Sequence, residues 1–260
     1  MGRVQDQVAV VTGAAHGLGR AIAIRLAEEG ARLALGDVDR PALEKTVADI
    51  QAEGGTAFGL LGDVTDEGPA AKLIAEAVTR YGGRIDVLVN NAGATKRGDF
   101  LTLSDSDWAD GFALKLFGAM RLSRAAWPHL CSSSGTIVNI VGIGGRTGQA
   151  EFAIGGAVNA ALLNLTKVLA DRGIKDGVRV NAINPGGIAT DRLQTRLRTF
   201  AAEHHIDLGK AEEEMARSFG VARFGQPEEI ARLVAFLASP QAAFCQGAIV
   251  DADGGQTRTL

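Results

Sequence analysis

The chain has 260 residues, of which 46% are hydrophobic, and its formal net charge at pH 7 is -3. That length and apolar content suffice for one large domain, and no Pro/Ser-rich linker divides the sequence, so we expect a single domain over residues 1–260. The weakly acidic balance gives no reason to expect a nucleic acid or an anionic membrane as a partner.

Membrane spans, leader sequences and metal sites are not expected either. The longest apolar stretches are too short or too interrupted to cross a bilayer, and the start MGRVQDQVAVV lacks the basic flank, apolar core and cleavage site of a signal peptide. Cys131 and Cys245 fit neither a disulfide framework nor a zinc site. We therefore expect a cytoplasmic protein with no membrane partner and no metal.

The first elements are a strand, a glycine-rich turn and a helix. The apolar run Val8–Val11 predicts a buried strand, the motif TGAAHGLG over Thr12–Gly19 predicts a turn, and a helical pattern follows. Gly13 permits a sharp bend, Gly17 lets the backbone approach a pyrophosphate, and Gly19 lets the helix pack closely on the sheet. Free N–H groups at the start of the helix would face the anion. A tight turn without a ligand is the alternative.

The second predicted strand, 31–35, leads to an acidic residue. Asp37 follows the glycines at close to the offset of roughly 20 residues that is typical of a dinucleotide fingerprint. At the carboxyl end of a strand, its carboxylate can accept hydrogen bonds from both hydroxyls of an adenine ribose, and it would repel a 2′-phosphate. NAD is therefore favoured over NADP, with a solvated loop aspartate as the alternative.

The rest of the chain alternates short apolar runs with longer helical ones. Further strands are predicted at 57–61, 85–89, 135–141 and 178–183, with helices between them. Strands at this spacing form a parallel sheet covered on both faces, because right-handed crossovers leave few other solutions. The predicted fold class is α/β: a single-domain, doubly wound, Rossmann-type parallel sheet with helices on both faces. Ligands of such sheets bind at the carboxyl ends of the strands.

A series of motifs, in order and nearly from end to end, resembles the short-chain dehydrogenase/reductase family: TGAAHGLG, DV at 63–64, NNAG at 90–93, PGGIAT at 185–190, RFGQPEEIA, FLAS and DADGG. The resemblance implies an NAD-dependent oxidoreductase in which 63–64 hold the adenine, 90–93 support the cofactor, and 185–190 contact the nicotinamide carboxamide. The expected cofactor-binding residues are Gly13, His16, Gly17, Leu18, Gly19, Asp37, Val38, Asp63, Val64, Asn90, Ala92, Gly93, Asn159, Pro185, Gly186, Ile188 and Thr190.

The catalytic residues of the family are not conserved in this alignment. The family uses a serine after the fifth strand, a tyrosine and a lysine one helical turn apart on the next helix, and an asparagine on the preceding helix. The corresponding positions here are Gly142, Gly155, Asn159 and Lys115. The single tyrosine, Tyr81, is expected at the amino edge of the sheet, opposite the cofactor.

Two of these replacements keep a polar side chain. Lys115 is the candidate catalytic residue, because its ammonium would occupy the space that the family's lysine leaves, where desolvation lowers a lysine pKa toward useful values. An ordinary solvated lysine is the alternative. Asn159 either hydrogen-bonds a ribose hydroxyl or only fills space. A slipped alignment would bring Phe152 near the site, and phenylalanine carries no proton.

A helical substrate lid is expected at about 190–220, where the family places one. Its histidines could supply a proton near neutral pH, or be plain surface residues, and its arginines attract an anionic substrate or form a solvated basic face. Two residues that flank the Gly142 loop are further candidates. These polar side chains are Arg192, Arg196, Arg198, His204, His205, Arg146 and Glu151.

Three functions fit these patterns. The favoured one is an NAD-linked oxidoreductase with an altered proton relay, acting on a small alcohol or carbonyl that the sequence does not identify. The others are a non-redox enzyme that keeps NAD as a helper, and a catalytically degenerate NAD-binding sensor or partner subunit. The helical run from Ala157 to Ala170 is apolar on more than one face, and the family commonly assembles through such helices, so a homo-oligomer, dimer or tetramer, is expected.

Overall fold

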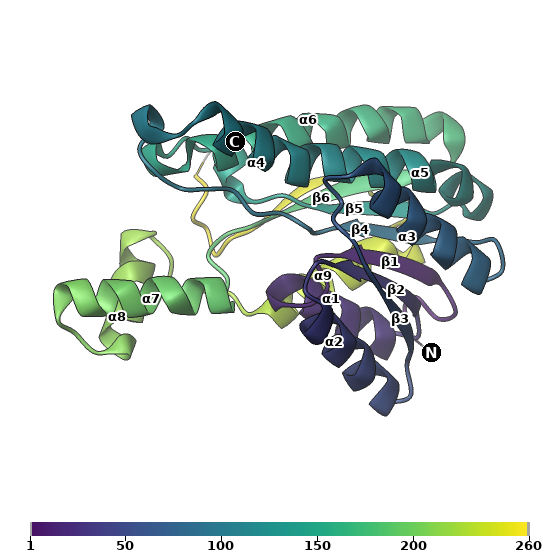
Figure 1. Cartoon of the computed structure of the whole chain (residues 1–260), viewed down its shortest axis with the longest axis horizontal. Coiled ribbons are helices and arrows are strands. Elements are labelled where there is room, and N and C mark those ends of the chain that lie inside the picture. Colours follow the sequence, from purple (N-terminus) through teal and green to yellow (C-terminus); the bar gives the residue numbers. More distant parts are fainter. Residues whose placement is uncertain (1, 259–260) are drawn as a thin grey trace.

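Over residues 2–258, which the computed structural model describes, the chain folds around a seven-stranded parallel sheet in the order β3-β2-β1-β4-β5-β6-β7 (Figure 1). This confirms the predicted Rossmann-type α/β class. The order reverses between β1 and β4, where ligands of doubly wound sheets bind. The strands are β1 (Val8–Thr12), β2 (Arg32–Asp37), β3 (Thr56–Leu61), β4 (Val87–Asn90), β5 (Thr136–Ile140), β6 (Arg179–Pro185) and β7 (Ile249–Ala252).

Helices cover both faces of the sheet, and each face has its own apolar core. Ile22 and Leu26 pack with Ile230 on one face, and Leu73 packs with Leu122 on the other. Figure 1 shows α7 and α8 projecting from this body on the side where the strands have their carboxyl ends. The first face carries α1 (Gly17–Glu28), α2 (Arg40–Ala52) and α9 (Pro227–Ala238), the second carries α3 (Glu67–Arg80), α5 (Gly118–Ser133) and α6 (Ala153–Asp176), and the remaining helices are α4 (Asp105–Phe112), α7 (Asp191–His204) and α8 (Leu208–Ser218).

Two local features go beyond the sequence prediction. The predicted strands occur with shifts of one or two residues at their ends, but β7 is not predicted at all. It is short, and it pairs with β6 from Ala182 opposite Ile249. Between α4 and α5 the backbone widens into a π-helical turn, Ala113–Phe117, which contains Lys115. Such turns occur frequently at functional sites.

One helix corrects the expectation that no segment has the properties of a membrane span. By length and composition alone, Ala150–Asp176 is long and apolar enough to cross a membrane, with a mean hydropathy of 1.4 over its most apolar window. In the fold, its residues Ile154, Val158 and Leu162 are buried, and α6 packs on β6. The core helix of a doubly wound sheet passes the same test, since it buries apolar side chains on more than one side.

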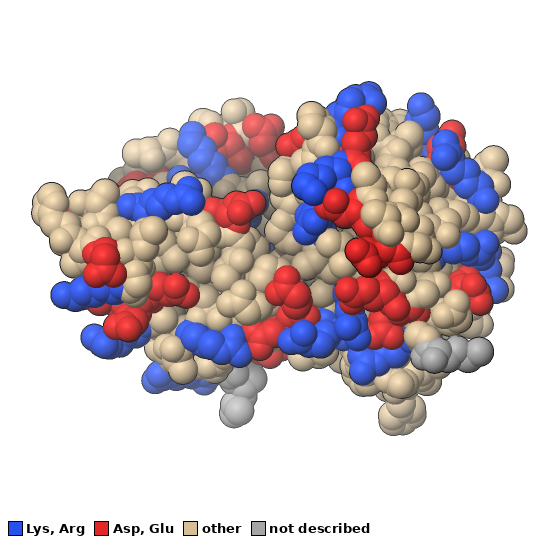
Figure 2. Space-filling view, turned by 90° about the horizontal axis from the view of Figure 1, so that it is seen from below, with Lys and Arg blue, Asp and Glu red and all other residues tan. Residues whose placement is uncertain are grey.

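Charges of both signs alternate over the face of the described chain drawn in Figure 2. Charged residues on α1 and α2 form ion pairs, with Arg20 2.7 Å and Lys45 2.9 Å from the carboxylate of Asp49. Exposed pairs of this kind contribute about 0–1 kcal/mol each. This face therefore carries no large field of a single sign.

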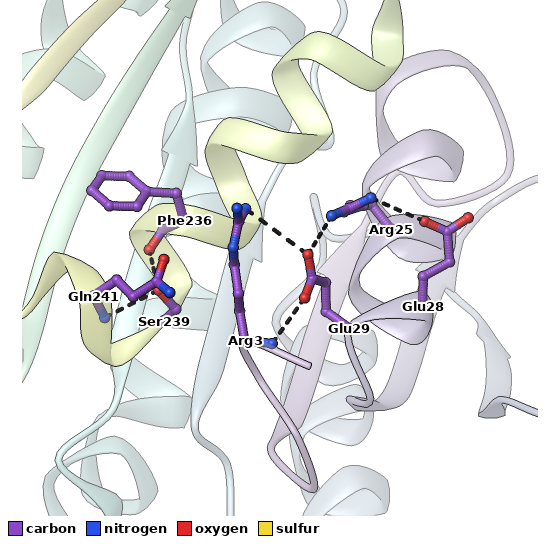
Figure 3. A network of polar contacts seen from close by, with 7 residues as sticks. All are labelled: Arg3, Arg25, Glu28, Glu29, Phe236, Ser239 and Gln241. Atoms are coloured by element: carbon purple, nitrogen blue, oxygen red, sulfur yellow. Dashed lines mark hydrogen bonds and ion pairs between the residues drawn. The ribbon is translucent and has the colours of Figure 1, made fainter. Parts of the chain in front are cut away.

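The start of the chain is tied to the end of α1 by a carboxylate (Figure 3). The backbone N–H of Arg3 donates to Glu29 Oε2 over 2.8 Å, and the guanidinium of Arg25 donates to Oε1. Beside this network, the Ser239 hydroxyl donates to the Phe236 carbonyl and closes the end of α9. The Arg3 N–H, together with Arg25, holds the pKa of Glu29 below its usual value, although burial acts in the opposite direction.

We expect Glu29→Gln to lower the free energy of unfolding at pH 7 by about 1–3 kcal/mol, because charge-assisted hydrogen bonds at a buried residue are weakened. A lowered folded-state pKa stabilises the protein above the unfolded pKa, and that stability is lost as the pH falls through the folded pKa. The difference from wild type should therefore shrink below about pH 4.5 in denaturant titrations. Glu28→Gln is the matched control, since its exposed ion pair should change stability by less than about 1 kcal/mol. An equal loss in both variants would contradict the prediction.

Candidate active site

A cavity of about 990 Å³ opens at the carboxyl edge of the sheet. Its wall includes residues at or just beyond the ends of β1, β2, β3, β4, β5 and β6. Residues of α7 also belong to the wall. The reversal of strand order between β1 and β4 leaves room here, because the adjoining connections run to opposite faces.

Most of the residues predicted to bind a cofactor border this cavity. The group comprises Gly13, His16, Gly17, Leu18, Gly19, Asp37, Val38, Asp63, Val64, Ala92, Gly93, Asn159, Pro185, Gly186, Ile188 and Thr190. Segments as far apart in sequence as the glycine turn and the PGGIAT run therefore meet at one site.

Asn90 is the exception, since it does not border the cavity. Its side chain is buried away from the cavity, where Nδ2 donates to Asn139 Oδ1 over 2.8 Å and to Ser123 Oγ over 3.2 Å. The next residue, Asn91, borders the cavity and donates from Nδ2 to the carbonyl of Gly13 over 3.1 Å. Successive side chains of a strand alternate between faces, so a shift of one residue exchanges a structural asparagine for one that supports the glycine turn.

The glycine turn forms an open cradle at the start of α1. Gly13 and Gly17 have φ values of +64° and +50°, a region that L side chains rarely adopt. A Cβ on Gly19 would lie 1.8 Å from the Gly13 carbonyl oxygen, so only glycine fits there. Backbone without side chains at the N-terminus of a helix suits a diphosphate, and the turn therefore fits the dinucleotide that the sequence predicts.

Asp37 is fixed at the end of β2 by backbone donors. The N–H groups of Ala15, Val38 and Asp39 donate to its carboxylate over 2.9, 2.7 and 3.1 Å. A second carboxylate is adjacent, since Asp39 Oδ2 lies 2.9 Å from His16 Nε2. The hydrogen bond with His16 holds the pKa of Asp39 below its usual value. The cavity therefore has the carboxylate of Asp37 on its wall where β2 ends.

Lys115 lies on the cavity wall beside Gly93. A Cβ built on Gly93 would lie 3.1 Å from Lys115 Cδ, so the aliphatic stem runs directly over this glycine. The ammonium donates to the carbonyl of Val141, just beyond β5. Burial, and then the positive charge of Arg192, lower the pKa of Lys115 to about 7. Lys115 thus reaches the edge of the sheet with an amine that changes charge near neutral pH.

Gly142, Gly155 and Asn159 are the positions that the sequence predicts for the family's serine, tyrosine and lysine, and of these Gly142 and Asn159 border the cavity. Gly142 has φ +125°, a strained conformation for serine. The ring of Phe152 fills the space beside Gly155, where a Cβ would lie 2.0 Å from Phe152 Cζ. Asn159 is 3% exposed, and its Nδ2 donates to the Gly142 carbonyl over 3.4 Å. Its Oδ1 is buried and has no partner within residues 2–258. Asn159 borders the cavity as a residue, and this oxygen is the polar atom of its side chain that is left without a partner.

The other candidates separate into two groups. Tyr81 donates its hydroxyl to the Leu33 carbonyl over 2.9 Å at the start of β2, and does not border the cavity. The remaining residues outside the wall are His204, His205, Arg198 and Arg146, while Glu151, Arg192 and Arg196 border it. Arg97 also borders the cavity and is missed by the sequence analysis, because nothing in the pattern after NNAG marks a site residue.

This combination of sheet, glycine cradle and cavity defines a dinucleotide-binding protein. A family model described as enoyl-(acyl carrier protein) reductase matches residues 13–257. The short-chain reductase protein NovJ of Streptomyces niveus is 38% identical, over 97% of this chain and 94% of its own. The 3-oxoacyl-[acyl-carrier-protein] reductase FabG of Thermotoga maritima is 32% identical, over 97% and 98%.

Solved structures show the same fold over the whole chain. An actinorhodin polyketide ketoreductase with NADPH has a TM-score of 0.92 at 30% identity, covering 100% of both chains. A 7α-hydroxysteroid dehydrogenase complexed with NADH has a TM-score of 0.89 at 30% identity, covering 99% of this chain and 97% of its own. The chain belongs to the short-chain dehydrogenase/reductase family of NAD(P)-dependent oxidoreductases.

Proposed function

We propose that the protein is an NAD(H)-dependent oxidoreductase of a small carbonyl or alcohol in which Lys115 handles the proton in place of the family's usual catalytic residues. The observation that carries the proposal is the position of Lys115, whose amine lies at the cavity floor with a pKa near 7. A proton donor works best when its pKa lies near the working pH.

The aligned catalytic positions support this assignment. Glycine at 142 and 155 offers no side-chain proton, and the amide of Asn159 does not titrate. Restoring a tyrosine at 155 is blocked by the Phe152 ring. Among the described residues that border this end of the cavity, Lys115 is the group whose pKa is shifted to neutrality.

In this proposal, each residue near the reacting carbonyl has a role. NADH, when bound, would supply the hydride for the carbonyl carbon, and the Lys115 ammonium would give a proton to the oxygen of the same carbonyl. The Val141 carbonyl accepts a hydrogen bond from that ammonium and so fixes its position. Asn159 would hold the ribose next to the nicotinamide, and the neutral amine of Lys115 would accept the proton when the alcohol is oxidised.

The choice of NAD over NADP is part of the proposal and rests on Asp37. A 2′-phosphate would meet its carboxylate, and no arginine or lysine borders the cavity beside it within the described chain. Relatives do not decide the matter, since one solved structure contains NADPH and another contains NADH.

We expect Asp37→Asn to lower the ratio of the NADPH dissociation constant to that of NADH by about 10-fold or more, because the repulsive charge is removed while an acceptor oxygen stays. Fluorescence titration of both cofactors measures the ratio. Asp66→Asn, at the exposed N-cap of α3, should leave it unchanged. A wild-type protein that binds NADPH more tightly than NADH would contradict the NAD assignment.

The experiment that tests the proposed function combines NADH binding with a turnover assay. Oxidation of NADH is followed with a panel of aldehydes, ketones and keto acids, and reduction of NAD with the corresponding alcohols. Turnover of a panel member supports the oxidoreductase. Tight NADH binding with no turnover over the whole panel would favour a cofactor-sensing or partner subunit.

A homo-oligomer is also proposed. Phe117, Val168 and Ile174 are 42%, 55% and 73% exposed on or beside α5 and α6. Exposed apolar side chains on these helices support assembly through them. Light scattering after size-exclusion chromatography tests the proposal, and a monomer would contradict it.

A further inference from the structure

Three arginines border the cavity at the end that contains Lys115. Arg97 lies in the segment after β4, and Arg192 and Arg196 lie one turn apart on α7, so the latter two share a helix face. The guanidinium carbon of Arg97 is 4.1 Å from the centre of the Phe152 ring, and that of Arg196 is 5.6 Å from the centre of the Phe219 ring. Contact with an aromatic ring restricts a planar guanidinium that is otherwise exposed at the rim.

The arginines lie close enough to one another to interact electrostatically. Burial, Arg196 and Arg192 lower the pKa of Arg97, while Glu151 acts in the opposite direction. Arg192 also contributes to the lowered pKa of Lys115. Arg192 is therefore close enough to interact electrostatically with both Arg97 and Lys115.

Within residues 2–258, no carboxylate pairs directly with these three guanidinium groups. Over the described residues, none of the three forms an ion pair within 4.0 Å or a side-chain hydrogen bond, whereas Arg146 and Arg223 pair with Asp251 and Glu229. Glu151 and Asp191 also border the cavity and offset part of the charge. With Lys115 protonated, four cationic groups and two carboxylates border this end, which leaves an excess of positive charge.

We propose that this arginine cluster, Arg97, Arg192 and Arg196, binds an anionic group of the substrate, so that the reacting carbonyl or alcohol carries a carboxylate or a phosphate. The guanidinium fork matches both groups. The inference rests on the proposed function and adds the class of its substrate. The diphosphate of a bound cofactor would lie on the cradle at Gly13–Gly19, and the three arginines border the same cavity.

The test uses two pairs of ketones that differ in charge: 4-oxopentanoate with its methyl ester, and dihydroxyacetone phosphate with dihydroxyacetone. We expect kcat/KM for NADH-dependent reduction to favour the anion over its neutral partner by about 10- to 100-fold in at least one pair. The pair that shows the preference distinguishes a carboxylate from a phosphate. The preference should weaken as ionic strength rises, because the arginines are exposed at the rim.

Arg196→Gln and Arg97→Gln should each lower the anion-to-neutral ratio by about 10-fold. Arg192 is left unchanged in this series because it is coupled to Lys115. Arg198→Gln is the matched control, since Arg198 lies on the same helix outside the cavity wall, and it should retain the wild-type ratio. The NADH dissociation constant of every variant checks folding and tests whether the arginines bind the cofactor instead.

A binding measurement separates this inference from the proposed function. Calorimetric titration of the NADH-loaded protein with 4-oxopentanoate and with dihydroxyacetone phosphate requires no turnover. Binding that weakens in Arg196→Gln and not in Arg198→Gln, without oxidation of NADH, would support the anion site and contradict the oxidoreductase. Neutral ketones that bind and react as well as their anionic partners would overturn the anion site alone.

Discussion

Lys115→Met is expected to lower the rate of carbonyl reduction by about 100- to 10,000-fold, which is the usual contribution of a positioned general acid. Methionine has a similar length, so it can follow the same path over Gly93 without delivering a proton. NADH affinity should change little, because the cradle at Gly13–Gly19 is formed by backbone that this substitution leaves unchanged. The measurement is single-turnover reduction of whichever panel substrate reacts.

The pH dependence distinguishes proton transfer from a structural role. With a pKa of about 7, Lys115 is protonated below that pH, so reduction should slow by about tenfold per pH unit above it. Oxidation of the alcohol needs the neutral amine and should instead increase up to about pH 7. Lys115→Arg keeps the charge but does not titrate in this range, so its residual activity should lose the inflection.

Stability provides a second check on the same residue. A lysine whose folded-state pKa is about 7, against 10.5 when unfolded, releases its proton earlier in the folded state. The unfolded chain therefore binds more protons between those values, and the lysine's effect is to make the protein more stable as the pH rises through that window. Lys115→Met removes this dependence and should be at least as stable as wild type at pH 6, because no buried charge remains.

Lys72→Met is the control, since Lys72 is exposed on α3 and lies outside the cavity wall. It should keep the wild-type rate and pH profile. A Lys115→Met variant that is folded and retains both the rate and the inflection near pH 7 would exclude Lys115 as the proton donor.

The sequence predicts the fold well because its apolar runs are strong local signals. The strand β1 is buried over all five residues, as expected for a parallel sheet covered on both faces. β7 escapes prediction because it is short, lies at an edge and includes the half-exposed Ile249 and Val250 and the exposed Asp251. Its place is determined by pairing with β6, a contact distant in sequence.

The location of the cavity at the carboxyl edge of the sheet is predictable for the same reason. Which individual side chains face the cavity is harder to predict. The NNAG run locates the end of β4 correctly, yet only the alternation of side chains in space distinguishes Asn90, under α5, from Asn91, at the glycine turn. The π-helical turn that carries Lys115 has no periodic signature of its own. Arg97 reaches the cavity from an irregular segment, where no pattern indicates direction.

Phe152 shows most clearly what the sequence leaves open. Its position three residues before Gly155 is evident from the chain, but the overlap of its ring with the place of a Gly155 Cβ depends on the backbone before α6. If Gly155 stands at the position of the family's tyrosine, as we propose, the loss of that side chain and the placement of the Phe152 ring form one structural change. The steric coupling between positions 152 and 155 can be measured without knowledge of the substrate.

We expect Gly155→Ala to destabilise the protein by about 1–3 kcal/mol, although alanine is the better helix former, because its Cβ would lie 2.0 Å from Phe152 Cζ. Gly155→Tyr should cost at least as much and should not increase turnover. In a Phe152→Ala background the ring is absent, and Gly155→Ala should become neutral or stabilising by up to about 1 kcal/mol.

The four proteins of this double-mutant cycle, compared by denaturant titration, give the coupling energy between positions 152 and 155 directly. Gly68→Ala in α3 is the matched control, since a Cβ there meets no atom within 4 Å, and it should stabilise both backgrounds equally. A coupling near zero would mean that Phe152 leaves room for a side chain at 155. The space of the family's tyrosine would then be open, and steric exclusion at position 155 would no longer favour Lys115 as the proton donor.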